Sequence, residues 1–330
     1  MMMNNTLKSQ YKFRPGTVIN GKWNKNYYTL IHELGYGANG MVYLAESKQG
    51  YVALKMSDNA MSITSEVNVL KSFSKVPGST LGPSLLEIDD WETQNNRIPF
   101  YVMEYIHGPD LLTFVQKKGS GWSDVLILQL LSDLDRLHQE GWVFGDLKPE
   151  NLIVTGPPTR IRCIDVGGTT MIGRAIKEYT EFFDRGYWGA GSRKAEPSYD
   201  LFAAAMVMIN LAYPKRFQKQ GDGFIQLKKA IQAKPELAEH REILWKAING
   251  KYSNALEMRK DLLKNISHGS VGNPDSSSSV KGISTKPKKT GSASRVKRRR
   301  QSKFTSFLET IMIILVISFL YILYVYDHLM

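Results

Sequence analysis

The spacing of apolar residues changes once along the chain, and this change limits the folds that are available to it. Up to about residue 106 apolar and polar side chains alternate, which predicts strands within 27–35, 41–56 and 97–106. One helix is predicted among these strands, at residues 65–75. Farther along, helical spacing dominates and predicts helices at 111–117, 123–140, 198–212 and beyond 223. Strands first and helices after indicate a two-lobed α+β domain.

This domain is predicted to occupy residues 27–266, after a flexible N-terminal segment, 1–26, that has no signal-peptide core. The single cysteine, Cys163, excludes an internal disulfide framework and a zinc site built from cysteines. The net charge of +12 is concentrated in residues 281–303, which contain ten lysines and arginines and no acidic residue. The rest of the chain therefore carries only about +2. Residues 267–303, rich in Ser, Gly, Lys and Arg, are predicted to form a disordered basic linker.

An apolar run follows the linker, and its residues 310–326 include no charged side chain. Counted from Phe304, residues 304–326 would form a helix of roughly 34 Å, enough to cross a hydrocarbon core of about 30 Å. Basic residues flank the start of this run and only residues 327–330 follow it, so the positive-inside bias places the folded domain in the cytoplasm. The sequence predicts a single-pass, tail-anchored protein of the cell membrane with a short extracytoplasmic tail.

Three glycines, Gly35, Gly37 and Gly40, lie between two predicted strands. Without side chains, they would let a hairpin press its backbone against the phosphates of a nucleotide, although a flexible hairpin alone would also account for them. Lys55 ends the next predicted strand. A lysine in an apolar strand needs a phosphate or a carboxylate partner, and Glu66 on the following helix is the expected carboxylate.

The stretch Gly-Trp-Val-Phe-Gly-Asp-Leu-Lys-Pro-Glu-Asn, residues 141–151, combines side chains suited to phosphoryl transfer. Asp146 could orient and deprotonate a hydroxyl group, and Lys148 could neutralise charge on the transferring phosphoryl group. Asn151 offers a neutral oxygen to Mg²⁺, and Asp165, at the end of a later apolar run, offers a second metal contact. Phosphoryl transfer needs little beyond such positioning and charge neutralisation.

Taken in order, these motifs resemble the eukaryotic-like (Hanks-type) serine/threonine protein kinase family over about residues 27–266. The overall layout resembles the small membrane kinases of spore-forming bacilli, which suggests a bacterial protein linked to sporulation. The resemblance implies a β-rich N-lobe at about 27–106, a helical C-lobe at about 107–266, ATP with Mg²⁺ or Mn²⁺ as cofactors, and protein substrates.

The resemblance also implies a role for individual residues. Asp146 and Lys148 would be catalytic, Asn151 and Asp165 would bind metal, and Asp200 would brace the catalytic loop. The residues expected to bind ATP are Gly35, Gly37, Gly40, Val42, Ala53, Lys55, Glu66, Met103, Glu104 and Ile106. Among them, Met103 would be the gatekeeper, and the backbone of Glu104 and Ile106 would meet adenine.

The chain departs from the family pattern at regulatory positions. Phe144 and Gly145 replace a His-Arg pair whose arginine reads a phosphate on the activation segment, so control by that phosphate is not expected. Gly191 stands where the family has a glutamate, so the ion pair anchored there is expected to be lost, together with the usual threonine near Asp184. Candidate sites of autophosphorylation are Thr169, Thr170 and Thr180.

The basic linker suggests partners of negative charge. Its candidate polyanion-binding residues are Lys286, Lys288, Lys289, Arg295, Lys297, Arg298, Arg299 and Arg300. One possible ligand is double-stranded DNA, which would bind without sequence preference because the linker has no aromatic residue. Another is anionic lipid. The basic residues could also serve only to set the orientation of the chain in the membrane. DNA binding could raise activity by gathering chains into dimers for autophosphorylation. Two alternatives remain: a weak or inactive kinase fold that serves as a membrane-tethered binding module, and a small-molecule phosphotransferase.

Overall fold

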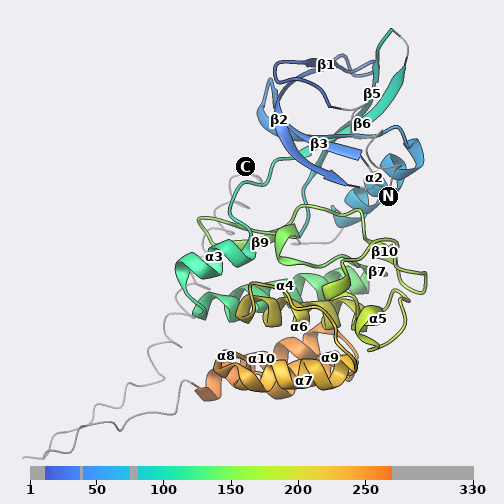
Figure 1. Cartoon of the computed structure of the whole chain (residues 1–330). Coiled ribbons are helices and arrows are strands. Elements are labelled where there is room, and N and C mark those ends of the chain that lie inside the picture. The colour runs from blue at the N-terminus through green and yellow to red at the C-terminus, as the bar shows by residue number, and fades with distance from the viewer. Residues whose placement is uncertain (1–11, 38–39, 75–80, 95, 270–330) are drawn as a thin grey trace, which may run out of the picture. The chain divides into compact units, whose positions relative to one another are not determined.

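The computed structural model describes residues 12–37, 40–74, 81–94 and 96–269, all within one compact unit that spans Met1–Pro274. Figure 1 shows strands β1 to β6 and helix α2 gathered at one end of this unit, and helices α3 to α10 at the other. The predicted α+β order, a strand-rich lobe followed by a helical lobe, is confirmed. No helix in the described ranges is long and apolar enough to cross a membrane. The predicted span at 304–326 and the linker from residue 270 lie outside those ranges.

The strand-rich lobe contains a six-stranded antiparallel sheet in the order β1-β2-β3-β4-β6-β5. Its strands are β1 (Val18–Asn20), β2 (Tyr27–Gly37), β3 (Gly40–Ser47), β4 (Gly50–Met56), β5 (Leu85–Glu92) and β6 (Arg97–Glu104). Alternate residues of these strands, such as Leu30, Tyr43, Leu54 and Phe100, are buried together in one apolar cluster. The alternation that predicted the strands therefore also identifies the face that forms the core.

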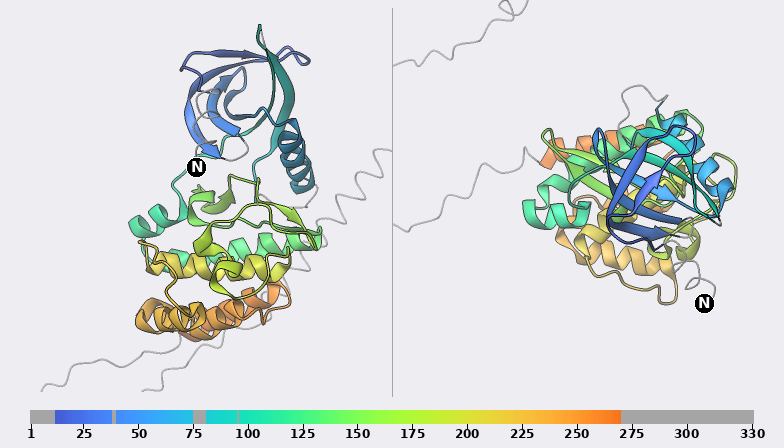
Figure 2. Two further views of the ribbon diagram at one scale, coloured as in Figure 1. Left: turned by 45° about the vertical axis from the view of Figure 1, so that its right-hand side comes forward. Right: turned by 90° about the horizontal axis from the view of Figure 1, so that it is seen from above.

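Helix α2 (Ala60–Phe73) packs against β5 and β6, and Figure 2 shows it beside the sheet. It begins five residues before its predicted start at Ser65. The side chain of Asn59 accepts hydrogen bonds from the backbone N–H groups of Met61 and Ser62, each at 3.1 Å. This cap satisfies donors of the first turn that have no partner within the helix, so the helix starts there despite its polar Ser and Thr residues.

The helical lobe is arranged around α6 (Pro197–Ala212), which is buried from Tyr199 to Asn210 and contacts α4, α9 and α10. Its other helices are α3 (Leu111–Lys118), α4 (Gly121–Gln139), α5 (Arg185–Trp188), α7 (Gly223–Ala233), α8 (Pro235–Ala238), α9 (Arg241–Ile248) and α10 (Ala255–Gly269). Two short strand pairs carry the segments between α4 and α6: β7 (Trp142–Val143) with β10 (Thr170–Met171), and β8 (Leu152–Thr155) with β9 (Arg160–Cys163). A helix that is apolar on all sides is stable only when it is enclosed in this way.

The predicted flexible segment 1–26 is wrong for the residues that the structure describes, because strand β1 pairs with β2 in register. The reason is a buried carboxylate. Asp89 on β5 is only 3% exposed and accepts hydrogen bonds from the backbone N–H groups of Trp23 (2.9 Å) and Asn24 (2.8 Å). These bonds fix the turn between β1 and β2, and the ring of Phe13 packs edge-on against Trp91 at 5.0 Å between centroids.

The ionisation of Asp89 should make the stability of this lobe depend on pH. Burial opposes the charge, but the backbone N–H donors outweigh it and lower the pKa of Asp89 below its ordinary value. A lowered folded-state pKa gives stability that is present above about pH 4 and is lost as the pH falls toward the folded-state pKa. We expect Asp89→Asn to lower the unfolding free energy at neutral pH by about 2 kcal/mol and to flatten its dependence on pH between about 5 and 3.

Urea unfolding at a series of pH values measures this effect. Glu46→Gln, at an exposed position of β3, is the matched control and should unfold as the wild type does. Equal acid sensitivity in Asp89→Asn and wild type would contradict the role of Asp89.

Candidate active site

A cavity of about 430 Å³ is lined by residues of both lobes. It brings together most of the predicted ATP-binding residues and both predicted metal ligands: Gly35, Gly40, Val42, Ala53, Lys55, Met103, Glu104, Ile106, Asn151 and Asp165. Gly37 pairs with Gly40 across the turn between β2 and β3, and Glu66 lies behind Lys55. Apolar side chains such as Ile153 also line the cavity, which suits the flat ring of a nucleotide base.

In the strand-rich lobe, Lys55 Nζ lies 2.6 Å from Glu66 Oε2, so the predicted pairing of these residues is confirmed. The two side chains are only 9% and 4% exposed, and each buried charge depends on the other for compensation. Tyr101 on β6 donates its hydroxyl group to the same carboxylate oxygen at 2.7 Å. Burial and the Glu66 carboxylate raise the pKa of Tyr101, which keeps the phenol protonated as a donor.

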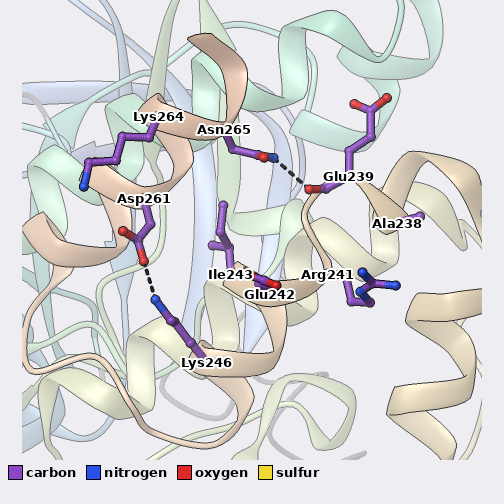
Figure 3. Close-up of a pocket in the computed structure, with 9 residues that line it drawn as sticks. All are labelled: Ala238, Glu239, Arg241, Glu242, Ile243, Lys246, Asp261, Lys264 and Asn265. Atoms are coloured by element: carbon purple, nitrogen blue, oxygen red, sulfur yellow. Dashed lines mark hydrogen bonds and ion pairs between the residues drawn. The ribbon is translucent and has the colours of Figure 1, made fainter. Parts of the chain in front are cut away.

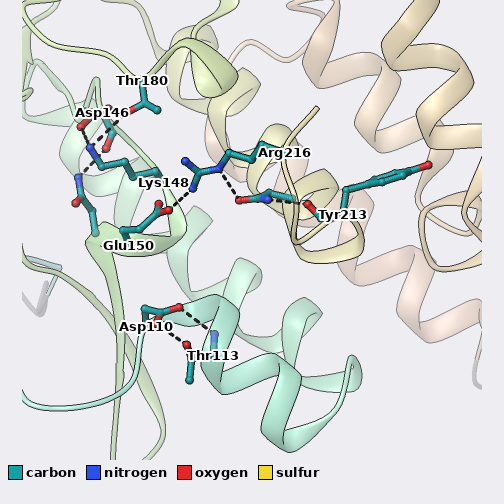
Figure 4. Close-up of polar contacts among 10 residues, drawn as sticks. Asp110, Thr113, Asp146, Lys148, Glu150, Thr180, Tyr213 and Arg216 are labelled. Atoms are coloured by element: carbon teal, nitrogen blue, oxygen red, sulfur yellow. Dashed lines mark hydrogen bonds and ion pairs between the residues drawn. The ribbon is translucent and has the colours of Figure 1, made fainter. Parts of the chain in front are cut away.

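The loop from Phe144 to Asn151, here called the catalytic loop, carries Asp146 next to Lys148 and Thr180 (Figure 4). Thr180 donates its hydroxyl group to Asp146 Oδ1 at 3.0 Å, and Lys148 Nζ forms an ion pair with Asp146 Oδ2. Lys148 Nζ also lies 3.3 Å from the Thr180 hydroxyl oxygen. Each of the three side chains therefore contacts the other two, and Asp146 is held in one orientation.

The candidate autophosphorylation threonines have different environments. Thr169 and Thr170 are 0% and 1% exposed, so neither hydroxyl group is accessible in this conformation, and their modification stays a prediction. Thr180 instead contacts Asp146. The expected loss of a threonine near Asp184 is therefore wrong, because Thr180, four residues earlier, reaches the catalytic loop.

Asn151 and Asp165 are held near each other by the backbone, because the N–H of Ile164 donates to the carbonyl oxygen of Asn151 at 3.0 Å. The side-chain amide of Asn151 donates to the carbonyl oxygen of Asp146 at 3.1 Å, which leaves its Oδ1 available as a ligand. Asp165 accepts one hydrogen bond, from the N–H of Gly167 at 3.0 Å. An amide oxygen and a carboxylate fit Mg²⁺, which takes few protein ligands and keeps phosphate oxygens and water as the others.

Asp200 on α6 holds the start of the catalytic loop in place. Its fully buried carboxylate accepts hydrogen bonds from the backbone N–H groups of Phe144 (2.7 Å) and Gly145 (2.9 Å). His138 Nε2, at the end of α4, lies 2.8 Å from the same carboxylate. The bracing contact inferred from the family resemblance is present, and His138, which sequence reasoning missed, is part of it.

Gly145 explains why an arginine is absent at this position. Its φ is +87°, and a Cβ atom there would lie 2.5 Å from the carbonyl oxygen of Gly168. Any larger residue would be strained in this backbone conformation and would displace the segment that follows Asp165. Glycine at 145 is thus required by the packing of the loop against that segment.

The segment that follows Thr180 is anchored by ion pairs that the sequence did not predict. Asp184 is fully buried and accepts hydrogen bonds from Arg193 Nη2 (2.6 Å) and the Tyr199 hydroxyl group (2.9 Å). Arg185 pairs with Glu196 at 3.3 Å and donates to the carbonyl oxygen of Ser192 at 2.6 Å. Gly191 has no carboxylate, so it forms no ion pair, as expected; Asp184 and Glu196 provide other ion pairs in the same segment.

One further contact joins the two lobes beside the cavity. Arg162 on β9 forms an ion pair with Glu104, with Nη2 2.9 Å from Oε2, and donates to the carbonyl oxygen of Gly82 at 2.7 Å. The guanidinium group lowers the pKa of Glu104, so this carboxylate stays ionised. The Glu104 side chain therefore holds the lobes together, while its backbone remains the part expected to meet adenine.

Tyr101 offers a test of the Lys55–Glu66 geometry. Tyr101→Phe removes a hydrogen bond to the Glu66 carboxylate, so Lys55 should be held less firmly toward the cavity. We expect the affinity for MgATP to fall about threefold. Isothermal titration calorimetry measures the affinity, with Tyr51→Phe, at an exposed position of β4, as the control for the same chemical change. Unchanged affinity in Tyr101→Phe would show that the hydroxyl group does not position the ion pair.

Asp200→Ala should destabilise the whole described unit. The substitution leaves two buried N–H groups of the catalytic loop without an acceptor, which should lower the unfolding free energy by about 3 kcal/mol. Asp200→Asn keeps one acceptor oxygen and should give a smaller loss. Chemical unfolding followed by tryptophan fluorescence is the measurement, and Asp58→Ala, at an exposed position, is the control. A loss no larger than that of the control would contradict the bracing role.

The sequence of the chain was compared with those of known proteins and protein families. A model of the protein kinase domain matches residues 28–285. The chain is 60% identical over 265 residues to the serine/threonine-protein kinase YabT of Bacillus subtilis, which covers 79% of this chain and 78% of that protein. It is also 32% identical to the serine/threonine-protein kinase cds1 of Schizosaccharomyces pombe, and 28% identical to the probable serine/threonine-protein kinase CPE1738 of Clostridium perfringens.

The last two matches each cover 41% of this chain, and 31% and 20% of the respective relatives. The match to YabT extends over most of both proteins. Because the domain model, the relatives and the arrangement of the site agree, the chain belongs to the protein kinase family and is a serine/threonine protein kinase similar to YabT.

Proposed function

We propose that this kinase transfers the γ-phosphate of ATP to serine and threonine hydroxyl groups of other proteins and of itself while residues 304–326 tether it to the membrane. The observation that carries the transfer is the contact of Asp146 with both Lys148 and Thr180 beside the cavity. The tether rests on the uncharged run at 310–326 and on the basic residues before it.

The residues of the site divide the work of the transfer. Asp146, oriented by Thr180, accepts the hydroxyl proton of the substrate, and its carboxylate has lone pairs beyond those already engaged. Lys148 stabilises negative charge near the attacking oxygen. Lys55, fixed by Glu66, holds the phosphates of the nucleotide, and Asn151 and Asp165 would hold Mg²⁺. Magnesium, when bound, neutralises charge on the phosphates.

The contact between Lys148 and Thr180 favours protein substrates over small molecules. It joins the catalytic loop to the segment 180–196, which is ordered by the buried Asp184 and on which a peptide substrate could rest beside Asp146. A small-molecule phosphotransferase would not need such a segment. The match to the protein kinase domain supports the same reading.

We further propose that double-stranded DNA binds the basic linker and raises kinase activity by bringing chains together. The support is the concentration of ten basic residues in residues 281–303. Each phosphate that they neutralise releases counterions, so binding should weaken steeply with salt. Chains gathered on one DNA molecule would phosphorylate each other at a raised effective concentration. Anionic lipid is the competing ligand of the same residues.

Autophosphorylation of the full chain in detergent micelles tests both parts. With Mg²⁺ and ATP, labelling should be present in wild type and fall at least about 100-fold in Asp146→Asn. DNA of any sequence should raise labelling at low salt and lose this effect at high salt. A variant with glutamine at the eight candidate polyanion-binding residues should keep the basal activity and lose the response to DNA.

The outcomes separate the proposals. Labelling that does not depend on Asp146 would contradict the assigned chemistry. Labelling that depends on Asp146 but ignores DNA, while vesicles rich in phosphatidylserine increase it, would assign the linker to the membrane.

A further inference from the structure

Glu150 is the exposed carboxylate of the catalytic loop. It lies four residues after Asp146, lines the nucleotide cavity, and its side chain is 55% exposed. A substrate hydroxyl group that reaches Asp146 brings neighbouring residues of its own chain past this loop. A basic residue beside the phosphoacceptor would therefore find Glu150 as a partner, provided that the carboxylate is free.

Arg216, in the segment between α6 and α7, occupies that carboxylate (Figure 4). Its Nη2 group forms an ion pair with Glu150 Oε1, and its Nε group donates to Asn210 Oδ1 at 3.2 Å. Asn210 is fully buried in α6, so it is a rigid anchor for the arginine. The Arg216 side chain itself remains 30% exposed.

The same guanidinium group also contacts the segment after Thr180, which flanks the expected position of the substrate hydroxyl group on its other side. Its central carbon lies 4.7 Å from the centre of the Phe183 ring, and Phe183 follows Thr180 by three residues. Thr180 in turn donates to Asp146. Arg216 thus touches both segments that flank the reacting hydroxyl group, the catalytic loop and the segment after Thr180.

A second carboxylate close to the cavity is occupied as well. Asp110 follows the cavity-lining residues Ile106 and Gly108, and it caps helix α3. It accepts hydrogen bonds from the backbone N–H of Thr113 at 2.9 Å and from the Thr113 hydroxyl group at 2.6 Å. At both Glu150 and Asp110, a basic side chain of a substrate would therefore meet a carboxylate that already has an internal partner.

An acidic side chain meets a different situation. A guanidinium group has five N–H donors, and the contacts of Arg216 within the described part of the chain use those on Nε and Nη2. The N–H groups on Nη1 can donate to a second carboxylate while Glu150 stays in place. The neighbouring Lys215 is exposed and adds to the positive charge of the segment.

We propose that Arg216 determines the charge preference of the kinase: it prevents Glu150 from binding a basic residue beside the phosphoacceptor and itself binds an acidic one. This inference rests on the proposed transfer to protein substrates. Arg216 acts on the binding of the substrate and not on the transfer of the phosphoryl group. Its removal should therefore change the relative KM of acidic and basic substrates more than it changes kcat.

The test compares serine peptides that differ only in having glutamate, alanine or arginine at the flanking positions. With the full chain in detergent micelles, wild type should have a kcat/KM about tenfold higher for the glutamate peptide than for the arginine peptide. Arg216→Ala should reverse this order because Glu150 becomes free. Glu150→Gln should do the opposite and sharpen the preference for glutamate, because Arg216 loses its internal partner.

Lys246→Ala is the matched control. Like Arg216, Lys246 forms an ion pair with a carboxylate. It lies 2.8 Å from Asp261, in a separate hollow between α9 and α10 (Figure 3). This variant should keep the wild-type ratio between the peptides. Because each ratio compares two peptides on one variant, a general loss of folded enzyme cancels out of it.

A ratio that is the same in wild type, Arg216→Ala and Glu150→Gln would overturn the inference. So would a chain that phosphorylates itself but none of the peptides, since no preference for flanking charge would then exist. A wild-type chain that phosphorylates neither itself nor any peptide would instead contradict the proposed protein kinase activity.

Discussion

The carboxylate of Asp200 is the contact on which the geometry of the active site depends. The catalytic loop has an irregular backbone, and its first N–H groups are buried where water cannot satisfy them. One carboxylate, fixed in the buried helix α6, accepts two of these donors and also contacts His138. These bonds fix the start of the loop and thereby the positions of Asp146, Lys148 and Asn151, which all lie within six residues of Gly145.

The fold could be predicted where burial follows a regular period. Strand β2 and helices α3 and α4 have such periods, and their existence was predicted within a few residues. Helix α6 was predicted from its long apolar run instead, since it is buried on all sides. Strand β5 was missed because its apolar Leu86 and Ile88 are 52% and 40% exposed, whereas its buried residue is Asp89. Strand β1 is too short to show a period, and what holds it is that same carboxylate, a contact between residues more than sixty positions apart.

The site shows the same division between local and distant information. Asp146, Lys148 and Asn151 could be singled out because phosphoryl transfer requires a base, a cation and a metal ligand close together in the chain. Tyr101, Arg162 and Arg193 could not, because each acts on a carboxylate that only folding brings near. The ion pair between Arg193 and the buried Asp184 was missed for this reason, since no local motif indicates it.

The packing of Gly145 constrains how regulation of this kinase can change over evolutionary time. The Cβ atom of an arginine at this position would lie only 2.5 Å from the carbonyl oxygen of Gly168. A single substitution would therefore damage the loop before it could provide a new input, and the backbone near Gly168 would have to move first. An arginine at position 145 is therefore not accommodated by a single substitution. Regulation of this kinase would change more readily through how often the enzyme meets its substrates than through substitutions in the catalytic loop.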